Sequence, residues 1–248
     1  MNVNKLTFAA ALMVLAGNAF SADLTVSAAA SLKDAFGEII NHYQKQYPQD
    51  KIQLNTAGSG ALLQQALKGA PVDVLAFADE ETMNQAQQHD LINKATRHTF
   101  AKNSLVIAVP QSSHLRVNNL ADLTRSNFKQ IAISNPASVP VGRYSKAALE
   151  KAKLWDSLQP KVINTQNVRQ SLDYVARGEV DAGFVYNTDA ALMKDKVRVV
   201  KVVPTQEPVS YPIAVVKNST HAVEANRFEN YVRSAAGQNV LKRYGFTH

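Results

Sequence analysis

Strand-like and helix-like segments alternate along almost the whole chain, and this alternation restricts the possible folds more than any other feature. Helical periodicity is clearest after Ser31, where apolar residues from Leu32 to Tyr43 recur on one helix face. Strand–helix alternation with short connections is typical of an α/β fold with largely parallel sheets. We expect strands at residues 24–27, 52–55, 72–77, 104–109, 130–134, 161–164, 182–186, 197–203 and 212–216. We expect helices at residues 33–47, 61–68, 143–152, from 168 onward, and as one long helix at 220–236.

The first residues have the composition of an export signal. Lys5 precedes an apolar run over residues 6–16, and small residues follow at 19–22. This pattern predicts a signal peptide at residues 1–21, with cleavage after Ser21 or Ala22. The apolar run is shorter than the roughly 20 residues of a membrane-spanning helix, although a short buried N-terminal helix is an alternative. We therefore expect an exported protein that does not insert into the membrane.

Composition and motifs argue against several classes of function. The chain has no Cys, which excludes disulfides and thiol chemistry, and it carries a formal net charge of +7. Lys and Arg are spread thinly rather than concentrated on one element, so we expect no nucleic-acid partner. The His residues lack metal-ligand spacing, and nucleotide-binding loops and activated-serine motifs do not occur. We accordingly expect no enzyme activity, no catalytic residues, no cofactor and no free metal cation.

The domain organisation follows from length and from the absence of a linker. The 248 residues suit two domains of about 100 residues each, yet no Gly/Ser-rich segment separates them. We expect the chain to cross between the domains near residues 101–104 and again near 204–211. Residues 22–102 plus 208–248 would then form lobe 1, and residues 103–207 would form lobe 2. Such a double crossing makes a hinge and a cleft that can close over a ligand.

Four junctions repeat one pattern, in which a strand is followed by a tight turn of small residues and then a helix. They lie at residues 27–32, 55–60, 135–142 and 165–168. Backbone N–H groups at helix N-termini lack intrahelical partners and carry partial positive charge, so several in one cleft would bind an anion. Ser31 and Ser59 could add hydroxyl donors, and Tyr186 ends another strand. Each feature alone fits an ordinary helix cap or a half-buried aromatic residue, so together they favour an anion or another small polar ligand.

Several motifs carry a resemblance to a known family. In this order along the chain, they lie at residues 28–32, 69–73, 103–106, 139–144, 183–186, 211–216 and 242–246. From about Leu24 to the C-terminus, the chain resembles the periplasmic molybdate-binding proteins of ABC importers. The resemblance implies a type II periplasmic-binding-protein fold, in which each lobe is a mixed, mostly parallel sheet flanked by helices and the ligand cleft lies between the lobes.

The resemblance also implies a ligand, a site and a partner. Molybdate or tungstate would be held by the hydroxyls and amides of Ser31 and Ser59, the amides of Val141 and Val168, and the hydroxyl of Tyr186. The partner would be the membrane permease of an ABC importer, and we expect a monomer.

Other interpretations of the sequence stay open. The ligand could be another small anion, such as sulfate, chromate or a carboxylate. An exported enzyme that uses Ser31 or Ser59 as a nucleophile is a further alternative. We also expect Arg143, which follows the third junction, to face solvent, and the acidic residues at 79–81 to begin a helix rather than bind a metal.

Overall fold

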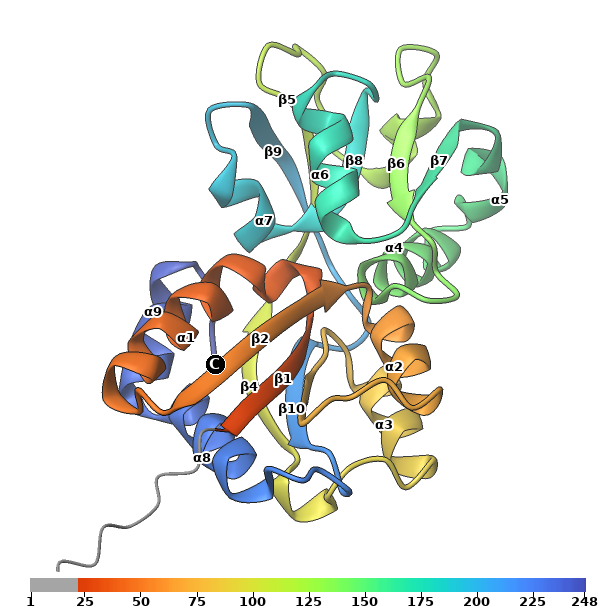
Figure 1. Ribbon diagram of the computed structural model, residues 1–248. Helices are drawn as coiled ribbons and strands as arrows, with labels where there is room; N and C mark the ends of the chain where they lie inside the picture. Colours follow the sequence, from red (N-terminus) through yellow and green to blue (C-terminus); the bar gives the residue numbers. More distant parts are fainter. Residues whose placement is uncertain (1–21) are drawn as a thin grey trace, which may run out of the picture.

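The computed structural model describes residues 22–248, so the expected signal peptide lies outside the described residues. Two mixed sheets, each of five strands and each flanked by helices, form two lobes (Figure 1). The two-lobed α/β fold expected from the sequence is therefore confirmed. Within residues 22–248, no helix combines the length and the apolar character that a membrane crossing requires.

Lobe 1 contains the sheet with strand order β2-β1-β3-β10-β4. The strands β2, β1 and β3 are parallel, whereas β10 runs antiparallel to both β3 and β4. The strands are β1 (Ala22–Ala29), β2 (Asp50–Ala57), β3 (Val74–Ala76), β4 (His98–Asn103) and β10 (Val209–Val215). The helices are η1 (Ala30–Leu32), α1 (Lys33–Gln46), α2 (Ser59–Leu67), α3 (Glu80–Gln88), η2 (Lys94–Thr96), α8 (Ala222–Arg233) and α9 (Ala235–Arg243).

Lobe 2 repeats this arrangement with the strand order β7-β6-β8-β5-β9. Here β7, β6 and β8 are parallel, and β5 runs antiparallel to both β8 and β9. The strands are β5 (Leu105–Pro110), β6 (Ile131–Ser134), β7 (Val162–Thr165), β8 (Ala182–Tyr186) and β9 (Val197–Val203). The helices are η3 (Leu120–Thr124), α4 (Pro140–Lys151), α5 (Trp155–Leu158), η4 (Gln159–Lys161), α6 (Val168–Ala176) and α7 (Asn187–Leu192). Parallel and antiparallel pairings are thus equally frequent in both sheets.

The chain passes between the two sheets twice. It leaves the first sheet at Ser104, between β4 and β5, and returns over residues 204–208, between β9 and β10. The first crossing leads from β4, at the edge of the first sheet, to β5, which lies one strand inside the edge of the second sheet. The second crossing leads in the same way from the edge strand β9 to β10. On this basis we propose residues 22–102 with 208–248 as lobe 1 and residues 103–207 as lobe 2. Two adjacent crossings are the usual construction of a hinge.

The expected strands all occur, but β4 was not predicted. Its sequence mixes exposed polar residues, such as His98 and Thr99, with the buried Phe100 and Ala101. A short edge strand of this kind lacks the alternating or continuous apolar pattern that identifies a strand in sequence. It is held by backbone pairing to β10 and by a bridge between Lys102 and Thr247.

The single long C-terminal helix expected at residues 220–236 is wrong. The chain forms α8 and α9 instead, and the break falls at Ser234, whose backbone is extended with φ −67° and ψ 164°. The Ser234 hydroxyl accepts a hydrogen bond from the Gly237 amide and so caps the second helix. The helix expected to begin at residues 79–81 is confirmed as α3, where the Asp79 carboxylate caps the Thr82 amide.

An aromatic cluster fixes α8 against α1 in lobe 1. The Phe228 ring contacts Phe36 and Tyr43 edge-on, with ring centroids 6.2 and 5.3 Å apart, respectively. All three side chains are fully buried. Because α8 follows the second crossing, this cluster packs the C-terminal part of the chain against α1, in the same lobe as the N-terminal strand β1.

Replacing Phe228 with Ala should lower the free energy of unfolding by about 3–5 kcal/mol, because a large buried ring is lost and a cavity remains. Val223→Ala is the matched control, since Val223 lies on the same helix with 74% of its surface exposed. Urea denaturation of both variants measures the difference. Equal midpoints for the two variants would contradict this assignment of the core.

Candidate functional site

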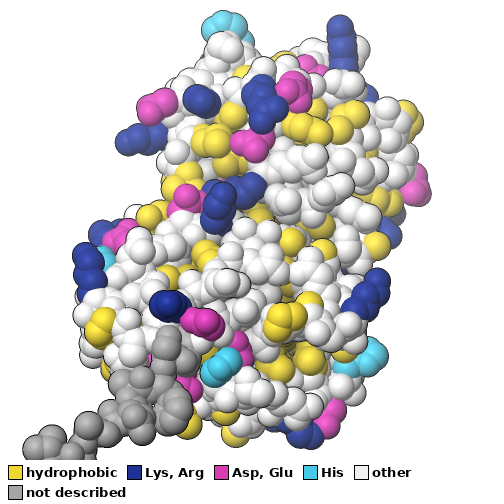
Figure 2. Space-filling view, viewed as in Figure 1, with side chains coloured by type: hydrophobic (Ala, Val, Ile, Leu, Met, Phe, Trp, Pro, Cys, Tyr) yellow, Lys and Arg dark blue, Asp and Glu magenta, His cyan; other side chains and the backbone are white. Residues whose placement is uncertain are grey.

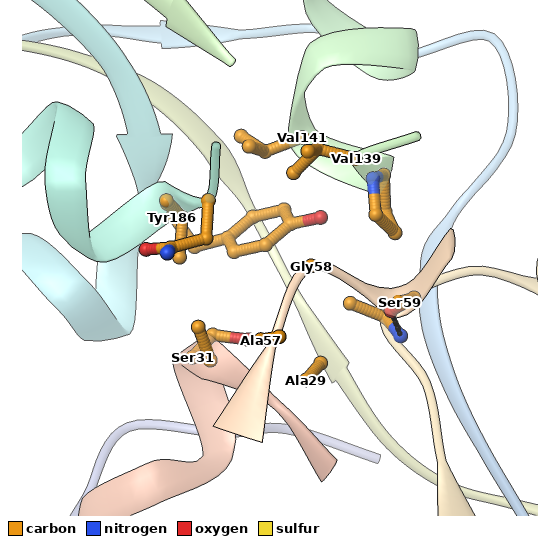
Figure 3. Close-up of a pocket in the computed structure, with 13 residues that line it drawn as sticks. Ala29, Ser31, Ala57, Gly58, Ser59, Val139, Val141 and Tyr186 are labelled. Carbon is orange, nitrogen blue, oxygen red and sulfur yellow. Dashed lines mark hydrogen bonds between the residues drawn. The ribbon is translucent and has the colours of Figure 1, made fainter. Parts of the chain in front are cut away.

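A small cavity lies between the two lobes (Figure 3). All of the residues predicted as ligand contacts line it, namely Ser31, Ser59, Val141, Val168 and Tyr186. The other lining residues are Ala29, Ala30, Ala57, Gly58, Ala78, Val139, Pro140 and Asn167. The junctions selected from the sequence therefore meet at one place.

The cavity lies at the carboxyl ends of parallel strands from both sheets. In lobe 1, Ser31 follows β1 within η1, and Ser59 is the first residue of α2 after β2. In lobe 2, Val141 lies in the first turn of α4 after β6, and Val168 begins α6 after β7. Tyr186 is the last residue of β8, and its ring lies across the pocket between Ser31 and Val141 (Figure 3). Loops at this edge of an α/β sheet are the usual place for a ligand.

A glycine allows the first turn of α4 to pack closely against the end of β6. A Cβ atom added to Gly142 would lie 2.0 Å from the backbone oxygen of Ser134. Any side chain at this position would therefore displace the first turn of α4, which carries the Val141 amide. Pro140, at the first position of the same helix, has no N–H and restricts the backbone, so it leaves that turn in a fixed orientation.

The lining of the cavity is uncharged and combines small apolar side chains with a few hydroxyls and backbone amides: Lys, Arg, His, Asp and Glu are absent from the described residues that form it. The helices α2 and α4 begin without a side-chain cap, so the amides of Ser59 and Val141 in their first turns have no side-chain acceptor. Helix dipoles add partial positive charge at these ends. The cavity therefore suits a small anion that accepts hydrogen bonds and needs no cationic side chain.

Two of the cavity hydroxyls have a hydrogen to donate. The Ser59 Oγ accepts a hydrogen bond from the Ala78 amide at 3.1 Å, which leaves its own hydrogen free (Figure 3). The Tyr186 Oη is buried and has no hydrogen-bond partner among the described residues. Burial also raises the pKa of Tyr186 well above its usual value, so the phenol keeps its proton. A buried donor without an acceptor is costly, and an acceptor ligand in the cavity would remove that cost.

Arg143 does not face solvent as expected from the sequence. Its Nε and Nη2 atoms donate to Asp79 Oδ2 at 2.8 and 2.6 Å, and Nη2 also donates to Thr82 Oγ1 at 2.6 Å. Asp79 and Thr82 belong to lobe 1, whereas Arg143 belongs to lobe 2. The carboxylate that caps α3 lies opposite the start of α4 and draws the guanidinium across the cleft. Arg143 thus bridges the lobes and does not line the cavity.

A second arginine, Arg169, also bridges the lobes beside the cavity. Its Nη1 pairs with Asp34 Oδ2 of lobe 1 at 2.6 Å, and its Nε donates to Asp189 Oδ1 of lobe 2 at 2.6 Å. Burial raises the pKa of Asp189 to about 6, and the Arg169 guanidinium opposes that rise. The sequence did not indicate this cluster, because its acidic members lie far from Arg169 along the chain. The two carboxylates offset the positive charge of the Arg169 guanidinium, so this charge contributes little to the electrostatic potential in the neighbouring cavity.

A backbone contact between the lobes shows that the cleft is closed. The Gly60 amide donates to the Ser138 carbonyl at 2.9 Å, across the boundary from α2 to the loop before α4. A Cβ atom on Gly60 would lie 2.5 Å from that oxygen. The approach of the two lobes therefore depends on a residue without a side chain at position 60.

A closed two-lobed fold with an uncharged, donor-lined cavity between the lobes defines a protein that binds a small solute. The chain belongs to the bacterial extracellular solute-binding proteins, whose family model matches residues 24–247. It is 35% identical to the molybdate-binding protein ModA of Escherichia coli K12, over 99% of this chain and 97% of that protein. It is 38% identical to a Bacillus subtilis protein described as an ABC transporter substrate-binding lipoprotein, over 90% of this chain and 86% of that protein. The fold matches the Azotobacter vinelandii periplasmic molybdate-binding protein with a TM-score of 0.79 and 23% identity, over 91% of this chain and 99% of that chain.

Gly60→Ala should weaken ligand binding at least about tenfold, because the added methyl group opposes closure and apparent affinity falls with the population of the binding-competent state. The stability of the ligand-free chain should not fall, since Ala favours a helix more than Gly does. Gly37→Ala is the control, because a Cβ at this helical position would meet nothing within 4 Å. Calorimetry with molybdate, the ligand expected from the sequence, and thermal melting measure the two effects. Undiminished affinity in Gly60→Ala would contradict the closed cleft as the binding state.

Proposed function

We propose that this chain captures molybdate, and also tungstate, outside the cytoplasm and delivers it to the membrane permease of an ABC importer. The observation that carries the proposal is the convergence of Ser31, Ser59, Val141, Val168 and Tyr186 on one cavity. The molybdate-binding protein of E. coli, aligned over nearly the full chain, supports the choice of ligand. The B. subtilis relative supports the assignment to an ABC transporter.

The proposed site suits a tetrahedral dianion. Such a ligand offers oxygen acceptors in every direction and no hydrogen to donate. The donors of the cavity would replace its hydration shell, while helix dipoles offset part of its charge. A protonated ligand, such as hydrogen phosphate, would place its O–H against groups that mostly donate, which leaves a buried donor unpaired. Sulfate is a smaller tetrahedron and would not reach every donor at once.

The proposed mechanism is closure of the hinge over the ligand. Molybdate first meets Ser31 and Ser59 on lobe 1. Rotation about the two crossings then brings Val141, Val168 and Tyr186 from lobe 2. The bridges of Arg143 and Arg169 join the lobes only when they close, so they favour the closed form without contacting the ligand. A permease that separates the lobes would break both bridges and expose the anion.

We further propose a periplasmic monomer that is released from the signal peptide at residues 1–21 and has no enzyme activity. A serine nucleophile needs an adjacent base, and the polar contact of Ser59 Oγ is a backbone amide, which cannot accept a proton. Figure 2 shows Lys and Arg side chains spread over both lobes on the face in view, which does not favour a nucleic-acid partner.

Calorimetry on the mature chain tests the proposal. We expect one molybdate per chain, comparable binding of tungstate, and sulfate and phosphate weaker by about tenfold or more. Ligand that binds only the folded chain should also raise the melting temperature. Equal affinity for sulfate would reject the size argument, and failure of molybdate and tungstate to bind would reject the function.

Ser59→Ala should reduce molybdate affinity by about 10- to 100-fold, since a hydrogen bond to a charged group contributes about 1.5–3 kcal/mol. Ser157→Ala is the matched control, because Ser157 is exposed on α5 and its hydroxyl bonds only the Leu154 carbonyl. Calorimetric titration of both variants gives the comparison. An unchanged dissociation constant in Ser59→Ala would show that this hydroxyl does not contact the ligand.

A further inference from the structure

Tyr211 lies behind the proposed site and does not line it. It belongs to β10 and is completely buried, with its ring 5.9 Å from that of Tyr186 and 5.3 Å from that of Phe246. Its hydroxyl lies 3.0 Å from Ser31 Oγ and 3.2 Å from Asn103 Nδ2. Tyr211 therefore touches one proposed ligand residue through its hydroxyl and another through its ring.

The direction of these hydrogen bonds follows from Asn103. The Ser104 amide donates to Asn103 Oδ1 at 2.9 Å, which fixes the oxygen side of the carboxamide. The nitrogen side then donates its two hydrogens, one to Thr188 Oγ1 at 2.8 Å and one to Tyr211 Oη. Because an amide nitrogen cannot accept, Tyr211 Oη is the acceptor in this contact.

Tyr211 has one hydrogen, and Ser31 Oγ is its available acceptor among the described residues. Burial raises the pKa of Tyr211 well above its usual value, so this hydrogen is retained. Ser31 Oγ then accepts from Tyr211 and keeps its own hydrogen for the cavity. In the reverse arrangement Tyr211 would accept twice, and its buried hydrogen would have no partner, which is unfavourable.

We propose that Tyr211, oriented by Asn103, is a positioning residue that fixes the Ser31 hydroxyl as a hydrogen-bond donor toward the bound oxyanion. This inference rests on the proposed function. In this arrangement Ser31 Oγ accepts from Tyr211 just as Ser59 Oγ accepts from the Ala78 amide. Both serines of lobe 1 then direct their own hydrogens toward the ligand. The consequence is specificity: Ser31 Oγ already accepts from Tyr211, so it has one lone pair fewer to offer a ligand that carries a proton.

A double-mutant cycle tests this proposal with Ser31→Ala, Tyr211→Phe and the combined variant, titrated with molybdate by calorimetry. Tyr211→Phe retains the ring and should weaken binding about tenfold. In the Ser31→Ala background the same change should have less than about a twofold effect, because the hydroxyl through which Tyr211 acts is gone. Tyr231→Phe, on α8 outside the cavity, is the matched control and should bind as the parent does.

A second readout separates positioning from packing. In Tyr211→Phe both lone pairs of Ser31 Oγ become available and the hydroxyl can rotate, so a protonated ligand is accommodated better and the ratio of phosphate to molybdate dissociation constants at pH 7 should fall. A purely structural loss would weaken both ligands alike and leave the ratio unchanged. If Tyr211→Phe does not fold, Asn103→Ala takes its place in the cycle, with a smaller effect that again disappears in Ser31→Ala.

The outcomes distinguish this proposal from the function on which it rests. If the parent chain does not bind molybdate, the proposed function fails. If the parent chain binds, but Tyr211→Phe costs as much in Ser31→Ala as it does alone, Tyr211 does not act through Ser31. That second result would overturn the positioning role and leave the proposed function intact.

Discussion

Hydrogen-bond donors buried between two lobes without an acceptor of their own are the constraint on which the rest of this structure depends. The Tyr186 hydroxyl is the clearest case, since it is buried and unpaired among the described residues. An unsatisfied buried donor costs about 1–3 kcal/mol, so a closed and empty cavity is unfavourable at that point. The bridges of Arg143 and Arg169 act in the opposite direction and favour closure. An oxyanion would shift this balance, because it supplies the acceptor that the closed cavity lacks.

The placement of those donors follows from the topology of the sheets. In each sheet a single strand, β10 or β5, runs against the other four, and the three neighbouring parallel strands direct their carboxyl ends toward the cleft. Helices that follow these strands begin at the cavity and bring their free amides with them. Glycine at positions 60 and 142 permits the close contacts that complete the cavity.

Much of this could be predicted from the sequence, because the decisive signals are local. Apolar periodicity identified the strands and the first helices, and small residues before Ser31 and Ser59 marked the junctions that form the cavity. The strand β4 was missed because its pattern is mixed and its stability comes from pairing with β10. The long C-terminal helix was wrong because the Ser234 cap breaks a pattern that apolar spacing alone would continue.

The contacts behind the site were beyond local inference. The expectation for Arg143 failed because its partner Asp79 lies 64 residues away and becomes a neighbour only when the lobes meet. The hydrogen bond between Ser31 and Tyr211 joins residues 180 positions apart, so no spacing rule could indicate it. Sequence patterns thus locate the groups that face the ligand, whereas the groups that orient them depend on the completed fold.

A crystal structure of the mature chain with molybdate tests the central claim most directly. The account predicts one oxyanion between the lobes, within hydrogen-bonding distance of the hydroxyls of Ser31, Ser59 and Tyr186 and the amides of Val141 and Val168, with Arg143 and Arg169 still paired to their carboxylates. An oxyanion bound to either guanidinium, or located outside this cavity, would contradict it.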